Sequence, residues 1–329
     1  MRNVTPMRML SLVSLLTAVG IITVLLLQGH SSAAGRHATL SGVTSSASGT
    51  PASTAAKPSA SQSAGAPASP SATASASASA SASATPAAVP ATAAPDQALL
   101  SATAQAHGAV SVAVTDLGTG QTLTYGAAGH GFATASIVKV DILSTLLLQA
   151  QDQGTTLTAS QESLATTMIE NSDNDSATAL WNEIGQEGGL NAANKRFGLT
   201  STTGGTEGNW GLTSTTSADQ LRLLRQVFTS DSLLSSRSRD YIQGLLNQVE
   251  SDQRWGVSAA ASGSDYAVKN GWLPRSATGL WVINSIGRVE RNGQELLVAV
   301  VSDGNLSESS GISLVQSVAQ AAAGSLSAG

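Results

Sequence analysis

A serine and a lysine three residues apart, Ser136 and Lys139, form the first group in the sequence whose chemistry could break a bond. They open an expected helix directly after residues 132–135, and a spacing of i, i+3 puts the hydroxyl and the amine on one helix face. A serine hydroxyl attacks a carbonyl poorly until a base removes its proton, and a lysine can be that base if its pKa is lowered. Free N–H groups at the helix start would favour developing negative charge. An isolated match of this kind is usually an ordinary helix start, with a capping serine and a solvated lysine.

Two further polar groups follow far along the chain. The first is the triplet Ser172-Asp173-Asn174, and the second is the segment 269–272, which reads Lys-Asn-Gly-Trp. Alone, the triplet is a polar connection between two helices, and a calcium site is disfavoured because the glycine and distal glutamate of an EF-hand loop are missing. Alone, the lysine segment is an edge strand and a turn. The block after residue 95 nevertheless has only three lysines, and two of them belong to these groups.

Several common catalytic signals are missing from the chain. It has no Gly-x-Ser-x-Gly, no phosphate-binding loop and no His-Glu-x-x-His. His107 and His130 are the only histidines after residue 95, and His130 lies in a Gly-His-Gly loop, which disfavours a Ser-His-Asp triad. The absence of cysteine excludes disulfides, thiolate metal sites and a cysteine nucleophile. A lysine-assisted serine is therefore the best catalytic candidate.

Composition divides the 329 residues at Pro95. All 11 aromatic and all 21 acidic residues lie after this position, together with 12 of the 16 basic residues, which gives the C-terminal block a net charge of −9. A negative surface repels phosphate, so no nucleic-acid partner is expected. Nearly all residues able to build a core belong to this block. We therefore expect one globular domain over residues 96–329.

The residues before this domain predict export. Arg2 and Arg8 precede 19 uncharged and mainly apolar residues, 9–27, which is long for a removable signal and long enough for a membrane anchor. Small residues at 31–34 could hold a cleavage site, so signal peptide and transmembrane anchor both remain open for residues 1–29. Residues 30–95, rich in Ala, Ser, Thr and Pro, predict a disordered linker. Either alternative places the domain outside the cytoplasm, secreted or anchored to the membrane by the N-terminal segment.

Hydrophobic periodicity in the C-terminal block predicts a mixed fold. The expected elements are a helix at 97–106, strands at 109–117 and 121–125, a helical middle at 137–249, strands at 266–272, 280–288 and 295–302, and a helix at 309–323. This order favours an α+β domain, in which an antiparallel five-stranded sheet is flanked by the N- and C-terminal helices and stands beside a helical lobe.

The three polar groups, in this order and on a helix, a helix junction and a late strand, resemble the motifs of the class A β-lactamases and penicillin-binding DD-peptidases. Three longer stretches are similar as well: residues 132–143, 168–180 and 215–221. The resemblance covers nearly all of 96–329 and implies the same α+β fold. It also implies a small β-lactam or peptidoglycan-like substrate, no cofactor and no metal ion, and a monomer is expected.

The resemblance implies roles for the first two groups. Ser136 would attack the amide carbonyl and become acylated, and Lys139 would accept its proton or keep the local field positive. Ser172 would relay a proton to the departing nitrogen. Asn174 would hold Lys139 and a substrate amide.

The resemblance makes the late strand the substrate-binding element. Lys269 would attract a substrate carboxylate, next to Asn270, Gly271 and Trp272. The backbone N–H groups of Ser136 and Trp272 would form the oxyanion hole, where the loss of one donor typically costs a few kcal/mol.

Three features depart from the family pattern. Deacylation in class A enzymes needs a glutamate that holds water, and Glu207 is the candidate although the usual Glu-x-x-Leu-Asn is missing. Glu207 is also only eight residues ahead of Thr215, which indicates a short loop. A glutamate in such a loop could equally be solvated and have no catalytic role. Glu170 is a weaker candidate for the glutamate that activates water. Asn270 replaces the usual threonine, which would change carboxylate recognition. Trp210 and Trp272 could line the site or the core.

Three functions follow, in order of preference. The first is a serine hydrolase of the β-lactamase type that is acylated at Ser136 and then releases the acyl group. The second is a cell-wall DD-peptidase or transacylase, and the third is a catalytically silent module that binds peptidoglycan or protein.

Overall fold

The structure is a computed structural model that describes residues 92–127 and 129–327. The predicted signal or anchor segment, and all but the last residues of the predicted linker, lie outside the described residues. Within these residues, no helix combines the length and the apolar character needed to cross a membrane.

A five-stranded antiparallel sheet forms the centre of the described part, in the order β2-β1-β7-β6-β5. The strands are β1 (Val110–Asp116), β2 (Thr122–Gly126), β5 (Tyr266–Pro274), β6 (Trp281–Arg291) and β7 (Gln294–Asn305). The tight turn between β6 and β7 uses Asn292 and Gly293 at φ 52° and 84°, as two-residue hairpin turns of this kind require. The predicted α+β fold with its five strands is confirmed.

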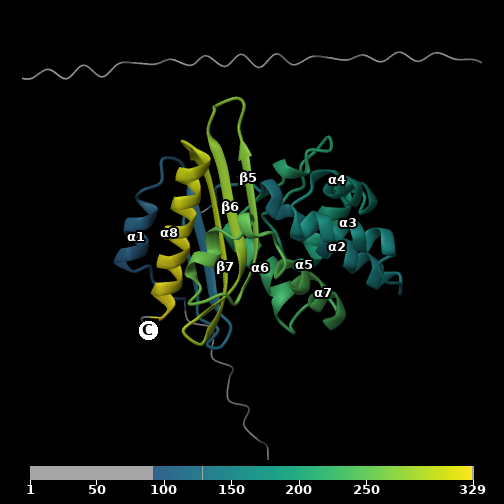
Figure 1. The fold of residues 1–329 in the computed structure, drawn as a ribbon, viewed down its shortest axis with the longest axis horizontal. Helices are drawn as coiled ribbons and strands as arrows, with labels where there is room; N and C mark the ends of the chain where they lie inside the picture. Colours follow the sequence, from purple (N-terminus) through teal and green to yellow (C-terminus); the bar gives the residue numbers. More distant parts are fainter. Residues whose placement is uncertain (1–91, 128, 328–329) are drawn as a thin grey trace, which may run out of the picture. The chain divides into compact units, whose positions relative to one another are not determined.

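Two helices cover one face of the sheet. They are α1 (Gln97–Thr103), capped by Asp96, and α8 (Glu308–Ser327), which lie together on the left in Figure 1. Alternate residues of the central strands point toward them and are fully buried, as a strand between two layers requires. Val112, Val300 and Val315 belong to this apolar layer.

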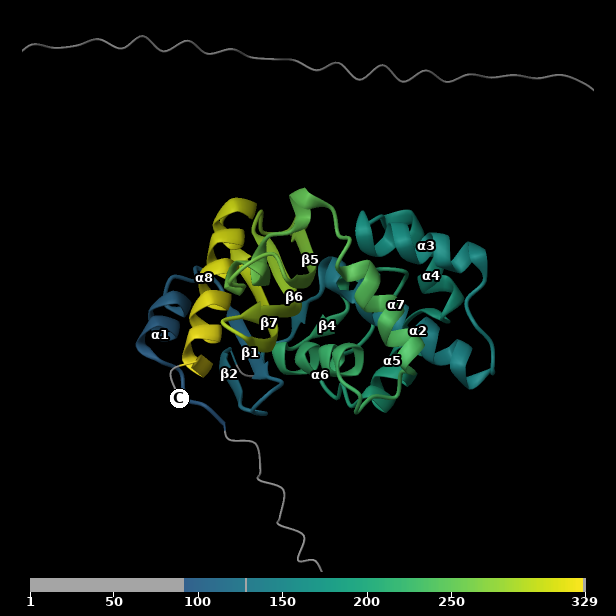
Figure 2. The same ribbon diagram turned by 60° about the horizontal axis from the view of Figure 1, so that its bottom comes forward.

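Six helices make up the opposite face and the helical lobe, which lies to the right of the sheet in Figures 1 and 2. They are α2 (Val138–Asp152), α3 (Ala159–Glu170), α4 (Asn174–Glu183), α5 (Gln186–Phe197), α6 (Ser217–Phe228) and α7 (Ser236–Leu246). Side-chain caps fix several starts: Thr158 and Gln161 form a capping box on α3, and Asp173 caps α4. The predicted helical middle is thus six helices with defined boundaries.

Short elements connect the lobe to the sheet. Two-residue strands β3 (Phe132–Ala133) and β4 (Ser214–Thr215) pair with each other, and four 3-10 turns follow the loops. The turns are η1 (Ala135–Ile137), η2 (Trp210–Leu212), η3 (Ser251–Gln253) and η4 (Gly256–Ala260).

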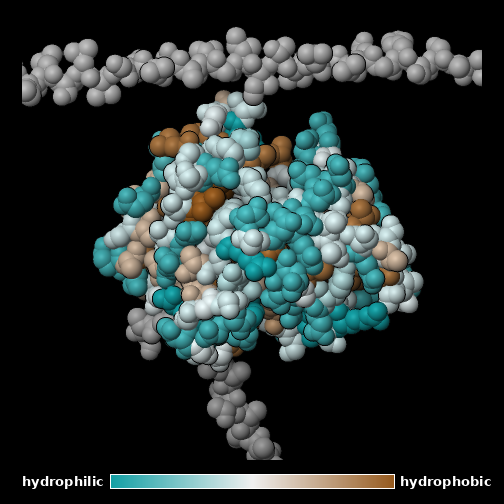
Figure 3. Space-filling model, in the orientation of Figure 1, coloured by the Kyte–Doolittle hydropathy of each residue, from teal (hydrophilic) through white to brown (hydrophobic). Residues whose placement is uncertain are grey.

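Hydrophobic residues on the face shown in Figure 3 form small separate patches within a mainly hydrophilic surface.

Candidate active site

Ser136 lies in the η1 turn, directly ahead of α2. The preceding residue, Ala135, has a φ of 46°, a strained value for a residue with a side chain. The Ser136 hydroxyl is half-buried and has no hydrogen-bond partner among the described residues. The direct contact with Lys139 that the spacing predicts is therefore not formed, because the serine lies on a 3-10 turn and the lysine on the α-helix that follows.

The Lys139 ammonium reaches the Ser172 loop instead. It donates to the Ser172 carbonyl at 2.5 Å, to Ser172 Oγ at 3.1 Å and to Asn174 Oδ1 at 2.9 Å. Its nitrogen also lies 5.0 Å from the ring centroid of Trp210, a cation–π distance. Burial lowers the pKa of this amine to about 7, although the Asp173 charge raises it. The structure thus brings together Lys139, Ser172 and Asn174.

Lys269 joins the same group from the edge strand β5. Its ammonium donates to Ser172 Oγ at 3.0 Å and to the Asn270 carbonyl at 3.1 Å. The side chain is fully buried, and burial, followed by the charge of Lys139, lowers the pKa of the amine well below its usual value. Ser172 itself has a φ of 56°, so the loop is held in a conformation that few side chains adopt.

Gly271 lets strand β5 lie against the η1 turn that carries the candidate nucleophile Ser136 (the nucleophile turn). A Cβ at this position would lie 2.7 Å from the Ser136 nitrogen and 2.7 Å from the Thr134 carbonyl oxygen, closer than real Cβ atoms come. Asn284 on β6 holds the same turn, because its amide nitrogen donates to the carbonyls of Ala133 and Thr134 at 2.8 and 2.9 Å. The sequence motifs included this glycine but gave no signal for Asn284.

The N–H of Trp272 points away from β6. In the regular β5–β6 register, Glu290 donates to the Asp265 carbonyl and Arg275 donates to the Leu280 carbonyl, so the odd-numbered residues of β5 form the hydrogen-bonded pairs. The even-numbered Trp272 therefore directs its N–H outward from the edge strand, on the side where Gly271 meets the nucleophile turn.

Asn270 is turned to the other side of the strand. Its amide nitrogen donates to the carbonyls of Gln253 and Trp255 at 2.7 and 2.9 Å, and the side chain is fully buried. The structure does not bring this amide to the cavity, so its predicted contact with a substrate carboxylate would require both hydrogen bonds to break.

A cavity of about 330 Å³ opens beside Ser136. It is lined by Ala135, Ser136, Asn174, Gly208, Asn209, Trp210, Gly211, Leu212, Trp272 and Leu273. Glu207 does not line it, and its side chain is exposed on a residue with a φ of 56°. The structure thus places Ser136, Asn174 and Trp272 at the cavity and the two lysines behind it. It places Glu207 outside the cavity, and Glu170 does not line it either.

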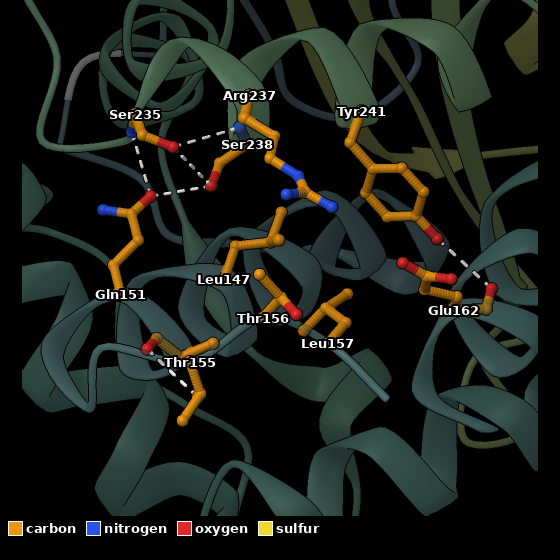
Figure 4. Close-up of a pocket in the computed structure, with 11 residues that line it drawn as sticks. Leu147, Gln151, Thr155, Thr156, Leu157, Glu162, Ser235, Arg237, Ser238 and Tyr241 are labelled. Carbon is orange, nitrogen blue, oxygen red and sulfur yellow. Dashed lines mark hydrogen bonds between the residues drawn. The ribbon is translucent and has the colours of Figure 1, made fainter. Parts of the chain in front are cut away.

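A second cavity lies within the helical lobe and contains none of the predicted site residues. It has a volume of about 240 Å³ and is lined from α2, α3 and α7 by residues that include Leu147, Glu162, Arg237 and Tyr241 (Figure 4). The candidate active site is therefore the cavity at Ser136.

One buried carboxyl supports α2 two residues after Lys139. Asp141 accepts a hydrogen bond from the Asn194 amide at 2.9 Å, and burial raises the pKa of its carboxyl to about 7. The second oxygen of Asp141 and the amide oxygen of Asn194 both lack a partner within the described residues. No motif marks this pair in the sequence, where the only indication is an aspartate among apolar helix positions.

A family model for the Beta-lactamase enzyme family matches residues 148–326, more than half of the chain. The chain belongs to the Beta-lactamase enzyme family. The segment of the chain that this family model matches contains Ser172, Asn174, Glu207 and Lys269 and begins after Ser136 and Lys139. The predicted recognition of the β-lactamase and penicillin-binding superfamily is confirmed.

Solved structures agree with this Beta-lactamase family fold. One is a mutant of PBP-A as an acyl-enzyme complex with penicillin G, with a TM-score of 0.59 and 20% identity over 70% of this chain and 95% of that one. Another is a class A beta-lactamase from Bacteroides cellulosilyticus DSM 14838, with a TM-score of 0.60 and 18% identity over 71% of this chain and 99% of that one. At these identities the likeness establishes the fold.

Curated relatives of this Beta-lactamase family member come from mycobacteria. The protein named "Putative lipoprotein LppW" from Mycobacterium tuberculosis (strain ATCC 25618 / H37Rv) is 29% identical over 170 residues, which are 50% of this chain and 54% of that protein. The Mycobacterium bovis protein of the same name matches equally. The chain thus spans about half the length of the curated relatives it matches.

Proposed function

We propose that the protein is an exported active-site serine hydrolase of the class A β-lactamase type, acylated at Ser136 by a β-lactam or a related amide or ester. The single observation that carries this proposal is the buried Lys139–Ser172–Lys269 group behind a cavity that Ser136 faces. A serine without a competing hydrogen bond, at a cavity backed by amines with lowered pKa values, is the arrangement that nucleophilic catalysis needs.

Acylation then follows from the positions of these groups. The Ser136 hydroxyl first turns toward neutral Lys139, which takes its proton as Oγ bonds to the substrate carbonyl carbon. The N–H groups of Ser136 and Trp272 bind the resulting oxyanion. The carbonyl re-forms as the bond to the leaving nitrogen or oxygen breaks. Ser172, which contacts both lysines, passes a proton to the leaving group and recovers one from Lys139. The products are the acyl ester of Ser136 and a neutral leaving group.

Release of the acyl group requires a water molecule and a base that activates it. In the leading proposal Glu207 activates that water, which requires its loop to turn the carboxylate toward Ser136. The exposed position of Glu207, outside the cavity lining, favours the second candidate, a DD-peptidase or transacylase whose acyl-enzyme lasts until an acceptor arrives.

The experiment uses the full chain with a fluorescent penicillin and with nitrocefin, followed by intact mass measurement. Rapid nitrocefin turnover that disappears in Glu207→Gln supports the hydrolase, whereas a stable adduct with slow release supports the peptidase. Ser136→Ala is the control and should give neither. Absence of an adduct in the unsubstituted protein, both with these carboxylate-bearing reagents and with the neutral ester 4-nitrophenyl phenylacetate, would refute both enzymes and favour a silent binding module.

Export forms part of the proposal. The curated relatives are named as lipoproteins, which agrees with a location outside the cytoplasm. N-terminal sequencing of the mature protein would distinguish a cleaved signal from an anchor, and an intact cytoplasmic chain would contradict export.

A further inference from the structure

The lining of the candidate active site contains no ionisable side chain. Its ten residues are one alanine, one serine, two asparagines, two glycines, two leucines and two tryptophans, and the large ones are Trp210, Leu212, Trp272 and Leu273. Leu212 is 43% exposed, so it presents apolar surface at the opening. A substrate group in this cavity therefore meets aromatic rings, aliphatic chains and neutral amides.

The two lysines behind the cavity donate hydrogen bonds to neighbouring protein groups. The three N–H bonds of the Lys139 ammonium point to three acceptors on Ser172 and Asn174, and the Trp210 ring covers the nitrogen. Lys269 donates to Ser172 and to a backbone carbonyl and has no exposed surface. Neither lysine lines the cavity, and both side chains are fully buried, so neither ammonium is exposed to a group bound there.

The other charges nearby do not favour an anion. Glu207 is exposed and directly precedes Gly208, which lines the cavity, and Asp173 and Asp175 flank Asn174 on the facing side. Arg275 lines a separate cavity, and Leu212 belongs to the lining of both. A carboxylate placed next to Ser136 would lose water without gaining a cation among the residues that line the cavity, which is unfavourable.

The two tryptophans are held in place and so form a prepared apolar surface. The Trp210 indole nitrogen donates to Thr178 Oγ1 at 3.1 Å. Trp272 packs edge-to-face on Trp255, with ring centroids 5.9 Å apart. Fixed aromatic faces bind planar apolar groups with little loss of side-chain entropy.

From this lining we infer that the site selects acyl donors whose acyl group is neutral and apolar, aromatic ones above all, and disfavours donors whose acyl group carries a carboxylate. The inference rests on the proposed acylation of Ser136 and narrows its substrate class. It differs from the role that resemblance gives Lys269, because this lysine belongs to the proton-transfer group.

The test compares two esters that differ by one charge: the 4-nitrophenyl esters of phenylacetic acid and of (4-carboxyphenyl)acetic acid. Acylation rates of the full chain are followed by release of 4-nitrophenolate, with Ser136→Ala as background and intact mass to locate the adduct. We expect the neutral ester to acylate Ser136 at least ten times faster. Equal rates, or a faster carboxylate ester, would overturn the inference while leaving acylation of Ser136 intact. If neither ester gives an adduct, the proposed function itself fails.

A matched pair of variants tests the cause of the preference. Leu212→Arg places a cation at the opening, and Leu212→Gln changes polarity without charge at the same partly exposed position. The arginine variant should raise the carboxylate ester rate relative to the neutral ester by at least five-fold over the glutamine variant. An unchanged ratio would overturn the inference, because the missing cation would then not be the cause.

Discussion

Lys139 and Lys269 donate to the same atom, Ser172 Oγ, at 3.1 and 3.0 Å. Two ammonium groups this close to one hydroxyl repel each other, and both amines lie out of contact with water. The pair therefore loses a proton more easily than either lysine would alone. Because the two amines titrate as a coupled pair, the pH behaviour belongs to the group as a whole.

The first prediction concerns the pH dependence of acylation. Neutral Lys139 is the proposed base, and burial lowers its pKa to about 7. The neutral fraction grows as the pH rises, so the acylation rate should increase with pH, reach half its maximum near pH 7 and level off above. Stopped-flow measurement with the neutral ester between pH 5 and 9 checks this, and a flat profile would contradict the base role.

The second prediction concerns the shared hydroxyl. Ser172→Ala removes the acceptor of both lysines and the proposed proton relay, and general acid–base groups typically contribute about 10²–10⁴-fold. We expect acylation of Ser136 to slow by at least about 100-fold by intact mass. The matched control is Ser176→Ala in the first turn of α4, where the hydroxyl contacts Thr167 instead. Equal rates in the two variants would exclude the relay.

The third prediction concerns Lys269. Because this lysine contacts Ser172 and does not line the cavity, Lys269→Ala should slow acylation by the neutral ester and the carboxylate ester by similar factors. A selective loss for the carboxylate ester would assign Lys269 to carboxylate recognition instead. The ratio of the two rates is the deciding measurement, since it does not depend on the amount of folded protein.

The sequence predicted which residues gather at the site better than how they contact one another. Hydrophobic periodicity placed the five strands and the helical lobe, because strand and helix repeats are local properties of the chain. Other contacts depend on loops that are distant in sequence. Examples are the hydrogen bond from Asn270 to the Gln253 carbonyl and the cation–π contact between Lys139 and Trp210. Glu207 is exposed in a short loop where it and Gly208 both have left-handed φ values, 56° and 75°, and the residue type of Glu207 gives no signal for this conformation.

The fourth prediction concerns the approach of β5 to the nucleophile turn. In Gly271→Ala the added Cβ would meet backbone atoms of Thr134, Ser136 and Ile137 at 2.7–2.8 Å, which no side-chain rotation can relieve. The turn must move, so we expect at least about 10-fold slower acylation and a stability loss of about 1–3 kcal/mol. Gly244→Ala is the control, because its Cβ meets nothing within 4 Å and the residue lies in α7. This control should gain about 0.5–1 kcal/mol.

The last prediction concerns the buried carboxyl of Asp141. Its pKa is raised from 3.8 to about 7 by burial, with a further contribution from the Asp219 charge. Between these values the unfolded chain has lost this proton and the folded protein keeps it, so stability falls as the pH rises toward 7. In Asp141→Asn the amide stays neutral, and its oxygen can still accept from Asn194. The free energy of unfolding of the variant, relative to that of the unsubstituted protein, should therefore be about 2–3 kcal/mol higher at pH 8 than at pH 5, since each pKa unit corresponds to about 1.4 kcal/mol.

Urea unfolding of both proteins at the two pH values measures this gain. The comparison cancels the contribution of the lysines, whose lowered pKa values make stability rise with pH in both proteins. Asp240→Asn, at an exposed position of α7, is the control and should follow the unsubstituted protein within about 0.5 kcal/mol. If Asp141→Asn shows the same pH dependence as the unsubstituted protein, then Asp141 is ionised in the fold, and its second oxygen must have found a partner that the ionised carboxylate can accept from.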